Sequence, residues 1–263
     1  MVSTQAWATA ILWLYATFGL FWALQWWLGQ HIQGLALLLF GRPGPASNIY
    51  FYLLAPGVML HELSHLLVAK LLLVRTGDVA LFRPNQNWRA AGPKITLGYV
   101  EVFRTDPWRQ SIIGLAPLPV GVLTLLLLAR PLGFPVVGVN HNEMLNTLRD
   151  FPSDLWQTLA QPINILWLYL VFTVSNGMLP SAPDRRPWLF GLILPGFVLL
   201  VLGITDHLPR FADDFQLAVI GWLGTLSLIF AFAALINLAL ALAIWLLETL
   251  VSKLKRRRVV YKR

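Results

Sequence analysis

The chain has 263 residues, of which 57% are hydrophobic and 12% are charged, and its mean hydropathy is +0.65. This composition argues against a water-soluble globule, because soluble domains carry fewer apolar and about twice as many charged residues. The net charge is +8, but the basic residues gather in one inter-helix segment and in the tail, as membrane topology signals do, rather than as a nucleic-acid footprint. The absence of cysteine excludes disulfides and thiolate metal sites, so any metal must be bound by His, Asp or Glu.

Six stretches along the chain are long and apolar enough to cross a bilayer, since a span needs about 20 mostly apolar residues. They are residues 6–27, 49–74, 110–129, 156–178, 187–204 and 218–250. The shorter apolar piece 34–40 either prolongs the first helix or lies in the membrane interface. The sequence therefore predicts an all-α polytopic membrane protein with about six transmembrane helices.

Lys and Arg in short loops predict the orientation of these spans. They gather between the second and third spans, after the fourth span and in the C-terminal tail. With six spans these three segments lie on one side of the membrane. We therefore expect both termini to be cytoplasmic, in a multi-pass protein of the cell membrane.

The loop between the second and third spans contains a candidate strand. Residues 94–103 read Lys-Ile-Thr-Leu-Gly-Tyr-Val-Glu-Val-Phe and follow a stretch rich in Pro, Asn and Gly. This pattern predicts a short cytoplasmic or re-entrant β-hairpin. Three parts result: residues 1–48 with the first transmembrane helix and an interfacial segment, a core at 49–186 with three transmembrane helices and the hairpin, and two C-terminal transmembrane helices with a basic tail at 187–263.

The second span carries His61-Glu62-Leu63-Ser64-His65, which matches H-E-x-x-H. Residues four apart share one helix face, so both imidazoles can reach one metal ion, while Glu62, about 100° round from His61, can aim its carboxylate at a metal-bound water. Zinc would lower the pKa of that water and polarise a scissile carbonyl, and Glu62 would take the proton and pass it to the leaving amine. Charged residues inside a span cost about 2.5–3.5 kcal/mol each, so three ionisable groups in five positions indicate a functional site rather than hydrogen-bonded bundle histidines.

A catalytic zinc usually has three protein ligands and one open position. Asp184 follows the fourth span on the side towards which the motif is displaced, so it is the best candidate for the third ligand. Pro180 and Pro183 precede it and predict an unwound helix end that can present a carboxylate inward. The alternative is a solvated turn aspartate. The other histidines are expected towards the opposite side: His31, His141 and His207.

These residues resemble the site-two protease family of intramembrane zinc metalloproteases. That family pairs H-E-x-x-H on one core span with an Asn- and Pro-rich segment that ends in a ligand Asp two spans later, and here Asn176 precedes Asp184 with a similar spacing. The family's Gly-Tyr-Val hairpin looks like residues 98–100. The resemblance covers about residues 50–186, and the chain differs from the family pattern at Ser64 and Arg185, where glycine is common.

The resemblance implies a zinc metalloendopeptidase that cuts membrane-spanning protein helices near the cytoplasmic face. Its expected partners are therefore a membrane-protein substrate and the lipid bilayer, and no nucleic acid. It further implies that the hairpin residues add an edge strand to the extended substrate. The residues with implied roles are the zinc ligands His61, His65 and Asp184, the base Glu62, Asn176 for orienting substrate or the oxyanion, and Gly98, Tyr99 and Val100 for binding substrate.

Two other functions stay open. A transporter of zinc or another divalent metal of the ZIP type carries H-E-x-P-H-E, but Ser64 and Leu66 stand where that signature has Pro and the second Glu. A non-catalytic membrane scaffold with a structural metal site is the other alternative. It would have no need of a general base at Glu62.

Overall fold

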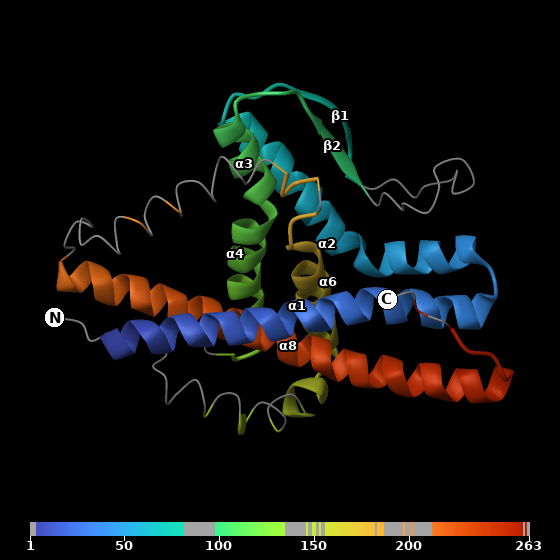
Figure 1. Cartoon of the computed structure of the whole chain (residues 1–263). Helices are drawn as coiled ribbons and strands as arrows, with labels where there is room; N and C mark the ends of the chain where they lie inside the picture. The colour runs from blue at the N-terminus through green and yellow to red at the C-terminus, as the bar shows by residue number, and fades with distance from the viewer. Residues whose placement is uncertain are drawn as a thin grey trace.

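A computed structural model describes residues 4–81, 98–134, 156–181, 183–186 and 212–259, together with positions 146, 149, 150, 153, 197, 201 and 261. These residues are mostly helical and include one small sheet (Figure 1). The helices are α1 (Thr4–Phe40), α2 (Pro43–Leu71), α3 (Pro107–Leu115), α4 (Pro117–Ala129), α6 (Pro162–Gly177) and α8 (Asp213–Lys255). The strands are β1 (Thr76–Ala80) and β2 (Tyr99–Val102).

Four helical segments are long and apolar enough to cross a membrane: residues 5–40, 48–71, 107–129 and 213–255. They confirm the predicted class, a helical membrane protein. The predicted span 156–178 contains α6, which has 16 residues and is therefore shorter than a full crossing. The predicted span 187–204 lies outside the described residues except at positions 197 and 201.

The apolar residues 34–40 belong to α1, which continues without a break to Phe40. Of the two possibilities open from the sequence, prolongation of the first helix is therefore the one observed. Gly41 follows the last helical residue, and its φ of 66° is the left-handed conformation that glycine adopts easily. The Gly41 N–H donates to the Leu37 carbonyl at 2.8 Å, which satisfies one of the last carbonyls of α1.

Helices α1 and α8 lie side by side and run in the same direction (Figure 1). Trp7 Nε1 donates to Gln216 Oε1 near their beginnings, and His31 Nδ1 lies 2.6 Å from Glu248 Oε2 further along. Six successive crossings would make the first and last helices antiparallel, and the assignment of both termini to the cytoplasmic side assumes that order. Here α1 and α8 are parallel instead. Contacts between residues 209 and 217 positions apart in the chain set the relative direction of the two helices, and counts of Lys and Arg in loops cannot detect such contacts.

The end of α6 packs against α2 through glycine. A Cβ atom at Gly57 would lie 1.8 Å from the Thr173 carbonyl oxygen, and one at Gly177 would lie 2.5 Å from the Gly57 carbonyl oxygen. A Cβ at Gly121 would lie 2.3 Å from Met178 Cβ, so α4 also approaches this end closely. Small residues permit such backbone contact between membrane helices. The result is a three-helix core of α2, α4 and α6.

The two strands form an antiparallel sheet at the end of the molecule away from α1 and α8 (Figure 1). The predicted hairpin at 94–103 contains β2, but β2 pairs with residues 76–80, and residues 82–97 lie outside the description. The partner strand was missed because Gly77 and Asp78 interrupt any β-branched pattern there. Val102 packs with Ala69 and Ile113, which fastens the sheet to α2 and α3.

We expect Gly57→Ala to lower the free energy of unfolding by about 1–3 kcal/mol, because the added methyl group meets the Thr173 carbonyl and forces α2 and α6 apart. The measurement is unfolding of the purified protein in detergent micelles, followed by circular dichroism. Gly19→Ala in α1 is the matched control, since a Cβ at Gly19 meets nothing within 4 Å. Equal stability of the two variants would contradict the close contact.

Candidate metal centre

Two imidazoles from α2 and one carboxylate from the turn after α6 converge on one point. His61 Nε2 lies 3.5 Å from Asp184 Oδ2, and His65 Nε2 lies 3.4 Å from Asp184 Oδ1. The two Nε2 atoms are 3.1 Å apart. Ligands at about 2.0–2.2 Å from a tetrahedral zinc are about 3.3–3.6 Å from one another. The three side chains that the sequence predicts as ligands therefore form a group that can hold a metal ion.

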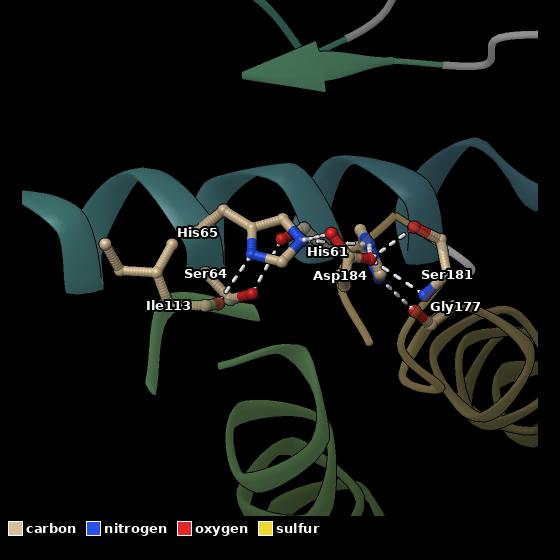
Figure 2. A network of polar contacts seen from close by, with 7 residues as sticks. All are labelled: His61, Ser64, His65, Ile113, Gly177, Ser181 and Asp184. Carbon is tan, nitrogen blue, oxygen red and sulfur yellow. Dashed lines mark hydrogen bonds and ion pairs between the residues drawn. The ribbon is translucent and has the colours of Figure 1, made fainter. Parts of the chain in front are cut away.

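The protonation of the two imidazoles makes this group electron-rich. His61 Nδ1 lies 2.6 Å from the Gly177 carbonyl oxygen, and His65 Nδ1 lies 2.7 Å from the Ile113 carbonyl oxygen (Figure 2). Carbonyl oxygens only accept hydrogen bonds, so each Nδ1 carries a proton, and in the neutral form of each ring Nε2 presents a lone pair. Two lone pairs and a carboxylate then face one another. A metal cation between them would stabilise this arrangement, and two nitrogens with one oxygen suit zinc.

A proline frees the carbonyl that orients His65. In an α-helix the Ile113 carbonyl would accept from the N–H four residues later, which is the position of Pro117. Proline has no N–H, so α3 ends at Leu115, and the Ile113 oxygen, which accepts from the Ala116 N–H at 3.1 Å, keeps its second lone pair for His65. The break between α3 and α4 thus supplies the hydrogen bond that fixes one ligand's tautomer.

The end of α6 supplies the corresponding acceptor for His61. Gly177 is the last residue of α6, and the carbonyls of a last helical turn have no partner within the helix. The N–H of Ser181, four residues on, donates instead to Asp184 Oδ2 at 2.7 Å. The Gly177 oxygen is therefore free for His61, and the negative end of the α6 dipole faces the imidazole N–H.

Asp184 is held by a turn rather than by a helix. The backbone N–H of Ser181 and its hydroxyl both donate to Asp184 Oδ2. In a capping box, too, the side chain three residues later accepts from the backbone N–H of the N-cap residue. A Cβ at Gly114 would lie 2.3 Å from the Asp184 carbonyl oxygen, so only glycine lets α3 approach this turn. Burial raises the pKa of the Asp184 carboxyl, but hydrogen bonds that His61 and His65 donate when protonated at Nε2, together with those from Ser181, outweigh burial and hold that pKa below its usual range.

Glu62 lies beside the sheet, next to the ligand pair. A Cβ at Gly98 would lie 2.8 Å from Glu62 Cγ and 3.0 Å from the Ala80 carbonyl oxygen, so the chain entering β2 passes directly over this glutamate. Along β2, Tyr99 is exposed and Val100 is half-buried. The structure thus places Gly98 against Glu62, and the substrate-binding role of Gly98, Tyr99 and Val100 stays a prediction.

The remaining predicted residues lie elsewhere. The Asn176 side chain donates to the Phe172 carbonyl at 2.8 Å and to Asn237 Oδ1 at 3.0 Å, so it is directed at α8 rather than at the ligands. Its role in orienting substrate stays a prediction. His31 on α1 contacts Glu248 on α8 and does not belong to the His61–His65–Asp184 group. His141 and His207 lie outside the described residues.

Several residues that build the centre were not singled out from the sequence. Ile113 and Gly177 act through backbone oxygens, and no residue type signals that role. Ser181 was detectable, because Ser-x-x-Asp is the spacing of a capping box. Pro117 was detectable only as a helix break, not as the cause of a free acceptor.

Comparison with known proteins matches the chain to no family model, no curated protein and no solved structure. The metal centre therefore stands on its geometry alone.

We expect His65→Ala and Asp184→Ala to lose bound zinc, because two ligands hold a metal far more weakly than three. The measurement is zinc per protein by elemental analysis after purification in micelles. His31→Ala, a membrane histidine outside the group, is the control and should keep wild-type zinc. Zinc retained in both ligand variants would contradict this assignment.

We expect Pro117→Ala to weaken zinc binding about tenfold, because the new N–H competes with His65 for the Ile113 carbonyl and partners of ligand histidines carry effects of this size. The measurement is the zinc Kd from competition with a chelator. Pro119→Ala is the matched control, since the carbonyl that it releases belongs to Leu115, outside this network. An unchanged Kd in Pro117→Ala would refute the role of the helix break.

Proposed function

We propose that this protein is an intramembrane zinc metalloendopeptidase, similar in its centre to the site-two protease family. The observation that carries the proposal is the convergence of two imidazole nitrogens and a carboxylate, with Glu62 next to His61 in the sequence. Three ligands leave a coordination position open, as catalytic zinc sites do and as closed structural sites do not. This favours an enzyme over a scaffold with a structural metal.

The roles of the chain's own groups follow from their positions. A bound zinc ion supplies Lewis acidity, which lowers the pKa of water and polarises a carbonyl. Glu62 accepts the proton of the attacking water at its carboxylate and passes it to the leaving amine. The Gly177 and Ile113 carbonyls hold the Nδ1–H groups of His61 and His65, so the Nε2 atoms are the ones directed at the metal. The semi-buried surroundings limit water and strengthen these electrostatic interactions.

The proposed substrate is a membrane-spanning protein segment in extended form. The ligands lie within or directly beside helices that can cross a bilayer, so a substrate reaches them from the membrane. The strand entered at Gly98 runs over Glu62, so an extended peptide at the metal would pass alongside this strand. Backbone pairing with a strand is an established way to bind extended peptides. It also requires the substrate helix to unwind locally.

We place the centre near the cytoplasmic face of the cell membrane. The segments that flank the sheet carry Arg75, Arg104 and Arg109, and basic residues next to spans favour the cytoplasmic side. The sheet lies at one end of the α2–α4–α6 core (Figure 1), and Gly98, directly before β2, packs against Glu62 of the H-E-x-x-H motif. Cleavage would thus occur close to that surface rather than at the bilayer midplane.

We expect Glu62→Gln to keep zinc and to lose at least about 10²-fold in peptide-bond cleavage, because the amide cannot accept the proton. The assay follows cleavage of casein and of fusion proteins with single transmembrane helices, in micelles, by mass spectrometry. Glu101→Gln in β2 is the control, since Glu101 contacts the backbone N–H of Asp78 and not the metal ligands. Cleavage by Glu62→Gln at the wild-type rate would refute the proposal, and zinc uptake into vesicles that survives Glu62→Gln would favour a transporter.

A further inference from the structure

Helices α1, α6 and α8 meet at three amide side chains, one from each helix, which we call the amide cluster. Gln25 Nε2 on α1 donates to the backbone carbonyl of Asn176 at 2.6 Å. Asn176 Nδ2 on α6 donates to Asn237 Oδ1 on α8 at 3.0 Å. Asn237 is fully buried among apolar residues of its helix. The cluster thus joins the α1–α8 pair to the α2–α4–α6 core.

The amide cluster is next to the metal centre along α6. The carbonyl of Asn176 accepts from Gln25, and the next carbonyl, that of Gly177, accepts from His61 Nδ1 at 2.6 Å. The Asn176 carbonyl is free because its helical partner four residues on would be Pro180, which has no N–H. One side chain from α1 and one metal ligand from α2 therefore hold neighbouring carbonyls of the same helix end.

This arrangement makes the position of the α6 end matter for zinc. The hydrogen bond to Gly177 sets the tautomer and ring orientation of His61, and the negative end of the helix dipole increases the basicity of its Nε2. A small rotation of the last turn would move the Gly177 oxygen away from Nδ1. Gln25 opposes that rotation through the adjacent carbonyl, and Asn237 does so through the Asn176 side chain.

Helix association alone does not account for the amide cluster. Membrane amides commonly hold helices together. Here, however, the buried atoms Gln25 Oε1 and Asn237 Nδ2 have no hydrogen-bond partner among the residues that the structure describes. Such atoms cost free energy in apolar surroundings. The one hydrogen bond that Gln25 makes with α6 ends on the carbonyl beside the His61 partner.

We propose that Gln25 and Asn237 are positioning residues of the metal centre, which fix the last turn of α6 so that the Gly177 carbonyl is aimed at His61. The inference rests on the proposed zinc site but not on peptidase activity. It gives the outer helices α1 and α8 a task, because both complete a centre whose ligands they do not provide. It also assigns Asn176 a place as the link between them.

The test is the zinc Kd of the purified full chain in micelles, measured by competition with a chromophoric chelator, together with the visible spectrum of the Co²⁺-substituted protein. Gln25→Met should weaken zinc binding about tenfold or more and shift the Co²⁺ bands, since it keeps the side-chain length but removes the donor. Asn237→Leu should weaken zinc binding by a smaller factor. Gln33→Met is the matched control, because Gln33 lies further along α1 and bonds Tyr50 instead; it should leave both readouts unchanged.

Wild-type zinc affinity and an unshifted Co²⁺ spectrum in Gln25→Met would overturn the inference. If that variant does not fold, Gln25→Asn takes its place: its amide is one methylene shorter and should show the same weakening, and wild-type affinity there would equally overturn the inference. The casein and fusion-protein assays report the proposed function separately. If Gln25→Met binds zinc more weakly but the wild-type protein cleaves no peptide bond, the inference is supported and the proposed function is refuted. If Gln25→Met binds zinc and cleaves substrate like the wild type, the proposed function is supported and the inference is refuted.

Discussion

The structure depends on holding three electron-rich atoms together in a largely apolar environment. His61 Nε2, His65 Nε2 and the Asp184 carboxylate lie within 3.1–3.5 Å of one another. Repulsion between them is strong at low dielectric, so the surrounding backbone must resist it until a cation binds. The glycine contacts supply that resistance, because Gly57 and Gly114 bring α6 and the Asp184 turn to distances that a side chain would forbid. Close helix packing and the metal centre are therefore one feature.

Interrupted helices provide the acceptors that the centre needs. A regular helix uses all its inner carbonyls, so a membrane histidine next to it finds no backbone partner. Here Pro117 and the end of α6 release the carbonyls of Ile113 and Gly177, and each receives one imidazole N–H. The same breaks that shorten the helices thus fix the tautomers of both ligands. Irregular backbone at this depth is tolerated because protein groups satisfy it.

The outer helices are connected to this centre by polar contacts rather than by apolar packing alone. The α1–α8 pair is held together at its basic end by His31, Glu248 and Tyr261, and Gly34 leaves the space in which the tyrosine ring lies. Towards the core the amide cluster extends from the same pair to the last turn of α6. The parallel pair therefore contacts the last turn of α6, whose Gly177 carbonyl is the partner of His61. This connection gives spans outside the H-E-x-x-H core a physical reason to be present.

The sequence by itself indicated the class of protein, most of the described helices, and the three side chains that the structure brings together as a possible metal site. Helical periodicity is local, so the spacing of His61 and His65 was sufficient to place both rings on one face, and the prolines before Asp184 were sufficient to predict an unwound end. Only the tertiary structure decided which carbonyls orient the imidazoles, that α1 and α8 run parallel, that β2 pairs with residues 76–80, and that the Asn176 side chain is directed at α8. These features depend on contacts between residues far apart in the chain. Composition and spacing carry no information about such contacts, because one apolar helix face packs against many partners equally well until close-packed glycines and buried amides select one.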